Sequence, residues 1–139
     1  MALSVFALIV LSFGALIGLA MAAYHFRGVK SGKGVGVLHG AFTLSGLTML
    51  IIAASQLGRG WALVLGFVAV AAGGAYLFYR QTKDEPWPAL VIVAHGGLAI
   101  VMLVTLGLWL GGVVGEEGDP VLPETPQIEE TFEGAEINR

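Results

Sequence analysis

Two histidines occur in nearly the same short sequence, VLHGAF at residues 37–42 and VAHGGL at residues 93–98. In both, a glycine follows the histidine, and the pair lies inside a long apolar run. An imidazole can bind a transition metal through one ring nitrogen, or it can hydrogen-bond a neighbouring helix. Because an ionisable side chain inside an apolar segment is a functional candidate whose partner must be found, His39 and His95 are the first candidates.

The elements that position these histidines are long and apolar. The chain is 56% hydrophobic and 12% charged, with a mean hydropathy of +0.83. Each apolar run has about 20 residues or more, enough for a helix to cross a hydrocarbon core of about 30 Å, and none contains Asp, Glu, Lys or Arg. The sequence therefore predicts an all-α integral membrane protein, a four-helix bundle in the lipid bilayer. Its four predicted helices span residues 2–24, 34–57, 60–79 and 87–114.

The distribution of charge predicts the topology. Basic residues gather in the loops at 25–34 and 79–88, and cytoplasmic loops carry such an excess of bases. We therefore expect both termini outside a bacterial-type inner membrane. Bases also follow the first run, whereas none precedes it, so it is expected to be a membrane helix rather than a signal peptide. Residues 115–139 form an acidic tail, either solvated and flexible or a docking segment for a partner protein.

The chain also contains an apparent repeat. The stretch AYHFRGVKSGKGVGVLHG (23–40) resembles AYLFYRQTKDEPWPALVIVAHG (75–96), and the second copy is four residues longer. Two tandem two-helix repeats would be related by an axis along the membrane normal. The second and fourth helices would then be equivalent and diagonal, with both histidines at similar depth. A diagonal pair leaves the gap that a flat macrocycle needs.

These features predict one b-type haem, with His39 and His95 as the ligands of its iron. Small residues near the histidines leave room for the ring, and bases in the cytoplasmic loops could pair with its two carboxylates. The predicted cofactor-binding residues besides the histidines are Gly36, Gly46, Gly96, Arg27, Lys33 and Arg80. The glycine spacings, such as Gly14-xxx-Gly18, equally fit close helix packing, with or without a cofactor.

Paired histidines on two helices of a four-helix membrane bundle, each beside a glycine, resemble those of the membrane-bound b-type cytochromes. These include the cytochrome b561-like and respiratory haem-b anchor-subunit families, and the resemblance covers residues 1–114. It implies electron transfer to or from a quinone or a partner redox subunit. Members with two haems have four helix-borne ligands, so two histidines imply one haem.

A second interpretation is a non-catalytic accessory subunit of a larger membrane complex. The histidines would then pack helices together, and the glycine-lined faces and tail would bind other subunits or a second copy. His25, at the end of the first helix, is expected to be interfacial, to hydrogen-bond a quinone or to serve as an alternative ligand. The sequence has no cysteine, no acid inside a span, no nucleophile–base pair and no basic stripe for nucleic acid. It therefore favours an electron carrier or accessory subunit over an enzyme acting alone.

Overall fold

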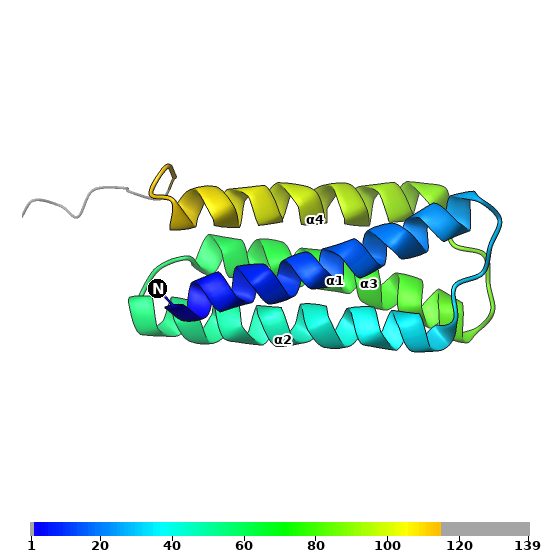
Figure 1. The fold of residues 1–139 in the computed structure, drawn as a ribbon, viewed down its shortest axis with the longest axis horizontal. Coiled ribbons are helices and arrows are strands. Elements are labelled where there is room, and N and C mark those ends of the chain that lie inside the picture. Colours follow the sequence, from blue (N-terminus) through cyan, green and yellow to red (C-terminus); the bar gives the residue numbers. More distant parts are fainter. Residues whose placement is uncertain (1, 115–139) are drawn as a thin grey trace, which may run out of the picture.

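The computed structural model describes residues 2–114 and is helical throughout, apart from short connections. Its four helices confirm the four predicted ones (Figure 1). The third helix ends three residues later than predicted, and the fourth ends at residue 110 rather than 114. The predicted tail at 115–139 lies outside the described residues. The helices are α1 (Ala2–Phe26), α2 (Lys33–Leu57), α3 (Trp61–Thr82) and α4 (Ala89–Leu110).

The connection between α2 and α3 is a tight turn of three residues. Gly58 and Gly60 take φ values of 67° and 90°, which lie in the left-handed region. Glycine enters this region without the steric cost that a Cβ brings. The turn holds α2 and α3 as antiparallel neighbours. At the opposite end of the bundle, longer loops join α1 to α2 and α3 to α4 (Figure 1).

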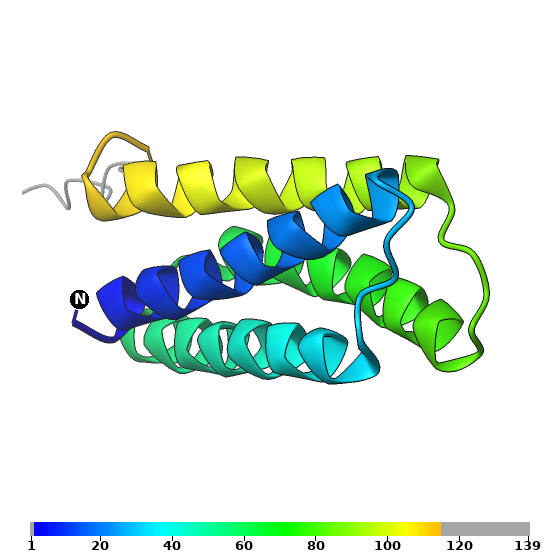
Figure 2. The same cartoon turned by 45° about the vertical axis from the view of Figure 1, so that its right-hand side comes forward.

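The bundle places α2 and α4 on a diagonal, as the sequence predicted. Helix α1 packs against α2 and α4, and α3 packs against the same two helices. Within residues 2–114, the backbones of α1 and α3 do not approach each other closely, and those of α2 and α4 do not either. Figure 2 shows α1 crossing toward α4 while α3 diverges from α4, so the bundle widens toward the end with the two longer loops. A side chain on α2 can therefore face one on α4 across open space.

The tight core occupies the other half of the bundle, near the N-terminus of α1 and the α2–α3 turn. Leu50 and Leu106 have almost no exposed surface, and they come from the diagonal helices α2 and α4. This packed half holds the helices together while the other half stays open. The buried cluster consists of Ala7, Leu11, Leu47, Leu50, Ala54, Leu63, Val64, Phe67 and Leu106.

The outer surface of the helices is strongly apolar. Leu16 is 63% exposed and Leu65 is 68% exposed, and many other large hydrophobic side chains are exposed too. All four helices are long and apolar enough to cross a membrane, judged by length and composition. Large apolar patches are rare on soluble monomers. The four candidate spans and the apolar exterior are those expected of a multi-pass membrane protein.

Removing a core side chain should cost far more stability than removing an outward one. Leu106→Ala leaves a cavity where a side chain with 0% exposure stood, and such changes cost about 2–5 kcal/mol. Leu65→Ala deletes the same atoms from an exposed position. Thermal unfolding in detergent should show a large drop in Tm for Leu106→Ala and a small one for Leu65→Ala. Equal drops would contradict this placement of the core.

Candidate functional site

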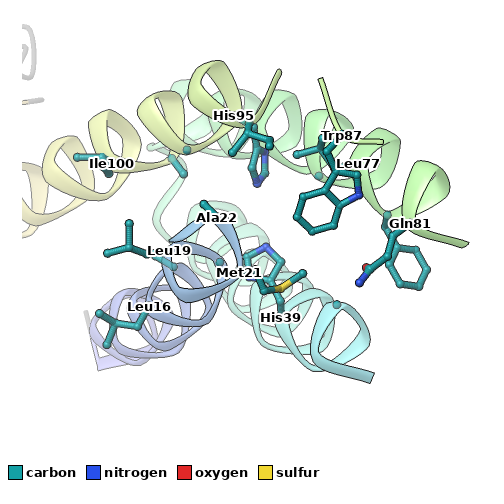
Figure 3. Close-up of a pocket in the computed structure, with 18 of the residues that line it drawn as sticks. Leu16, Leu19, Met21, Ala22, His39, Leu77, Gln81, Trp87, His95 and Ile100 are labelled. Atoms are coloured by element: carbon teal, nitrogen blue, oxygen red, sulfur yellow. The ribbon is translucent and has the colours of Figure 1, made fainter. Parts of the chain in front are cut away.

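His39 and His95 face each other across the open half of the bundle. His39 comes from α2 and His95 from α4, and their ring centroids are 6.3 Å apart with 78° between the ring planes. Figure 3 shows the two imidazoles pointing toward one another from opposite helices. Each lies six residues after the first residue of its helix, or about 9 Å along the axis. The two histidines therefore lie at equivalent positions along their helices, as expected from the sequence.

Each imidazole is fixed by one hydrogen bond to the adjacent helix. Nδ1 of His39 lies 2.8 Å from the carbonyl oxygen of Gly14, and Nδ1 of His95 lies 2.9 Å from that of Val70. A carbonyl oxygen can only accept, so Nδ1 carries the proton in both rings. In a neutral imidazole this leaves the lone pair on Nε2. Histidines that bind metals are oriented in this way, with the second nitrogen donating to a carbonyl or carboxylate.

Glycines on α1 and α3 make room for the two rings. A Cβ added at Gly18 would lie 2.8 Å from Cε1 of His39, and one at Gly74 would lie 3.0 Å from Cε1 of His95. Gly73 also approaches His95, with an added Cβ 3.3 Å from Nδ1. Gly73 and Gly74 were not among the residues predicted from the sequence, and Gly18 was expected only to pack helices together. Two sequence features could have revealed these residues: the Gly-Gly pair at 73–74 and the Gly-xxx-Gly spacing at 14–18. Both lie in helices that carry no histidine at the level of His39 and His95.

The two halves of the site are spaced identically in the sequence. His39 and His95 are 56 residues apart, and so are their bonded carbonyls at residues 14 and 70. The glycines at 18 and 74 and the first residues of α2 and α4, at 33 and 89, repeat this spacing. The Ala-Tyr pairs at 23–24 and 75–76, matched in the sequence analysis, are only 52 residues apart. The histidine contacts therefore repeat after 56 residues, whereas the Ala-Tyr pairs repeat after 52.

Two apolar cavities adjoin the histidine pair. One has a volume of about 420 Å³ and is lined mainly by α1 and α4. The other has a volume of about 470 Å³ and is lined mainly by α2 and α3. Both histidines line both cavities. A flat group placed between the two rings would extend into both spaces.

The three predicted glycines lie in different surroundings. Gly36 lines both cavities, and a Cβ there would collide with Oε1 of Gln81. Gly96 lines the α1–α4 cavity, with nothing within 4 Å of an added Cβ. Gly46 lies outside both cavities, and its added Cβ would be 2.6 Å from Cγ of Leu11. Gly46 therefore serves the contact between α1 and α2 in this structure.

The predicted basic residues lie at the end of the bundle with the longer loops. The Nζ of Lys33 is 3.0 Å from Oδ2 of Asp84, and the Nε of Arg80 is 2.8 Å from Oε2 of Glu85. Both bases thus have acidic partners from the loop that follows α3. Arg27 is exposed on the other loop.

A third cavity lies between the two loops. Its volume is about 380 Å³, and Lys30, Lys33 and His25 are among its lining residues. Gln81 and Trp87 line both this cavity and the α1–α4 cavity. The ring of His25 stacks on that of Trp87 at 5.4 Å, with 20° between the planes. The space beside the histidine pair therefore adjoins a polar space at the loop end.

The donor set limits the kind of metal that the site could hold. Among residues 2–114, no group of three or more His, Asp and Glu side chains could hold a metal ion. The two imidazoles supply two bonds, while structural metal sites usually need four or more ligands. A metal here would have to bring its other ligands with it.

Comparison with known proteins yields no relative: no family model, no curated protein and no solved structure matches the chain. The site is therefore interpreted from its own geometry.

The glycines beside the rings should not tolerate a methyl group. Gly18→Ala and Gly74→Ala would displace the imidazoles and break the Nδ1 hydrogen bonds, at a cost of about 1–3 kcal/mol for each buried group left unpaired. Gly40→Ala and Gly96→Ala are matched controls, because nothing lies within 4 Å of the added Cβ. Thermal unfolding in detergent should show lower Tm values for the first pair only. Unchanged Tm values for all four variants would contradict the close approach.

Proposed function

We propose that this chain is a membrane-embedded electron-transfer protein that holds one b-type haem between His39 and His95. The observation that carries the proposal is the separation of 6.3 Å between two rings whose Nδ1 atoms are already engaged. A metal–imidazole bond is about 2.0–2.1 Å, and each ring nitrogen lies about 1.1 Å from its ring centre, so two axial imidazoles place their centres about 6 Å apart.

The surroundings of the pair suit a flat macrocycle. A ring plane perpendicular to the line between the histidines would enter both cavities, which are lined chiefly by apolar residues. The macrocycle would also bring the four ligands that the protein lacks. Haem iron with two axial imidazoles supplies one-electron chemistry. The contribution of the chain is to fix both imidazoles, exclude water from the site and set its polarity.

The loop end suits the two carboxylates of a haem. The cavity beside the histidines adjoins one lined by Lys30 and Lys33, and charge-assisted pairs with carboxylates are favourable there. Lys33 and Arg80 would have to share or exchange their partners Asp84 and Glu85. The sequence prediction of Arg27 as a third carboxylate partner stays a prediction.

We also propose a membrane location and an electron-transfer partner for the chain. The basic loops favour insertion in a bacterial-type inner membrane, with those loops cytoplasmic and both termini outside. The equal spacing of 56 residues between the two half-sites supports two tandem helical hairpins. By the resemblance to membrane b-type cytochromes, a quinone or a partner redox subunit would exchange electrons with the haem.

The cofactor should be visible in the purified chain. A dithionite-reduced minus oxidised spectrum should show the sharp bands of a six-coordinate b-type haem, with one haem per chain. His39→Ala and His95→Ala should each remove the bands, because each deletes one axial ligand. His25→Ala is the matched control and should keep them, since His25 stacks on Trp87 at the loop end. Retained bands in both single ligand variants would refute the assignment.

The angle between the rings predicts a spectroscopic signature. Because the rings point toward each other, the 78° between their planes approximates the angle between the axial ligand planes. Crossed ligand planes in ferric haem give a strongly anisotropic low-spin EPR signal with one large g value. Parallel planes give a rhombic signal instead. Low-temperature EPR of the oxidised protein should show the first type, and a rhombic signal would contradict the ring geometry.

A structural role is the second candidate. The bonds from His39 to Gly14 and from His95 to Val70 join α1 to α2 and α3 to α4 without any cofactor. An accessory subunit of a larger complex could use the pair in this way, with its apolar faces against other chains. A flat visible spectrum from folded protein, together with a lowered Tm for His39→Ala, would favour this function over electron transfer.

A further inference from the structure

The histidine pair lies much closer to one end of the bundle than to the other. His39 is six residues from the start of α2 and eighteen from its end, and His95 is six and fifteen residues from the ends of α4. At 1.5 Å per residue, the near end is about 9 Å away and the far end about 22–27 Å. Electron transfer weakens steeply with distance. An electron carrier in water would therefore exchange electrons with this site across the near end.

The near end is called here the loop face, and it comprises residues 25–33 and 80–88. Trp87 and Gln81 line both the α1–α4 cavity beside the histidines and the cavity that opens between the loops. Trp87 also stacks on His25, and Figure 3 shows Trp87 beside the cavity into which His95 points. One layer of side chains thus separates the histidine cavity from the loop face.

The loop face is electropositive. It contains five Lys and Arg residues against two acids, Asp84 and Glu85, which gives a net charge of +3. Asp84 pairs with Lys33, and Glu85 pairs with Arg80. Within the described part of the chain, the other three bases form no ion pair; they are Arg27, Lys30 and Lys83. An acidic protein surface would complement these charges and be steered to them.

We propose that the loop face is the docking surface for an acidic, water-soluble protein that carries single electrons. This inference rests on the proposed haem function. A haem held by His39 and His95 would supply the one-electron acceptor, so the carrier would be oxidised by one electron and the haem reduced by one. No bond forms or breaks, and no proton moves. The bases hold the carrier where the distance to the histidine pair is shortest.

Docking is tested first as binding, which needs no haem. The probe is an acidic plant-type [2Fe–2S] ferredoxin, titrated onto the full-length chain in nanodiscs of neutral phosphatidylcholine. Lys83→Glu reverses one charge on the loop face, and Lys83 lines none of the three cavities. Arg59→Glu makes the same charge change in the turn at the opposite end of the bundle. At low salt we expect about a tenfold or greater loss of affinity for Lys83→Glu and less than twofold for Arg59→Glu.

Two further readouts separate this proposal from the haem assignment. Reduced ferredoxin should reduce the haem of the wild-type chain at a rate that falls with salt, and more slowly in Lys83→Glu. Charge-dependent binding to a chain that lacks haem would support the docking surface and overturn only the proposed function. Full haem content with equal ferredoxin affinity in wild type, Lys83→Glu and Arg59→Glu would overturn the docking surface. Equal ferredoxin affinity of wild type and Lys83→Glu once anionic phosphatidylglycerol is added would also overturn it, because the bases would then contact lipid headgroups.

Discussion

The structure depends on one interaction made twice, the hydrogen bond from a histidine Nδ1 to a backbone carbonyl of the adjacent helix. These carbonyls already belong to the helical ladder of α1 or α3, and each accepts a second bond through its free lone pair. In an apolar environment, an imidazole without a partner would be costly, so each bond fixes its ring strongly. Once Nδ1 is engaged, Nε2 of each ring is left for the space between α2 and α4. The two hydrogen bonds thus set the orientation of both rings without any cofactor.

The two halves of the bundle differ in how tightly they are packed. The half near the α2–α3 turn holds a close-packed core that includes Leu50 and Leu106. The half near the loops widens, as Figures 1 and 2 show, and both histidine cavities lie toward it. The α2–α3 cavity also reaches the core residues Leu11, Leu47 and Phe67. The close-packed half makes the buried apolar contacts that stabilise the bundle. A macrocycle placed between the imidazoles would add contacts to the other half.

Hydropathy and the repeated His-Gly pair were enough to predict the four helices, the diagonal placement of α2 and α4, and the similar depth of His39 and His95. Each of these follows from properties along a single helix or from the order of the helices. The roles of Gly18 and Gly74 could not be predicted, because they arise where one helix approaches the side chain of another. The acidic partners of Lys33 and Arg80 were missed for a related reason. They lie in a loop whose path depends on how α3 and α4 end, and proximity in sequence does not reveal which base each acid meets.

Titration of haem into the purified haem-free chain, followed at the Soret band, would show whether one macrocycle fits between the two preoriented imidazoles. We expect saturation at one haem per chain, with the spectrum of a six-coordinate low-spin centre from the first addition. Absence of saturable binding, a five-coordinate spectrum, or uptake of two haems per chain would contradict it.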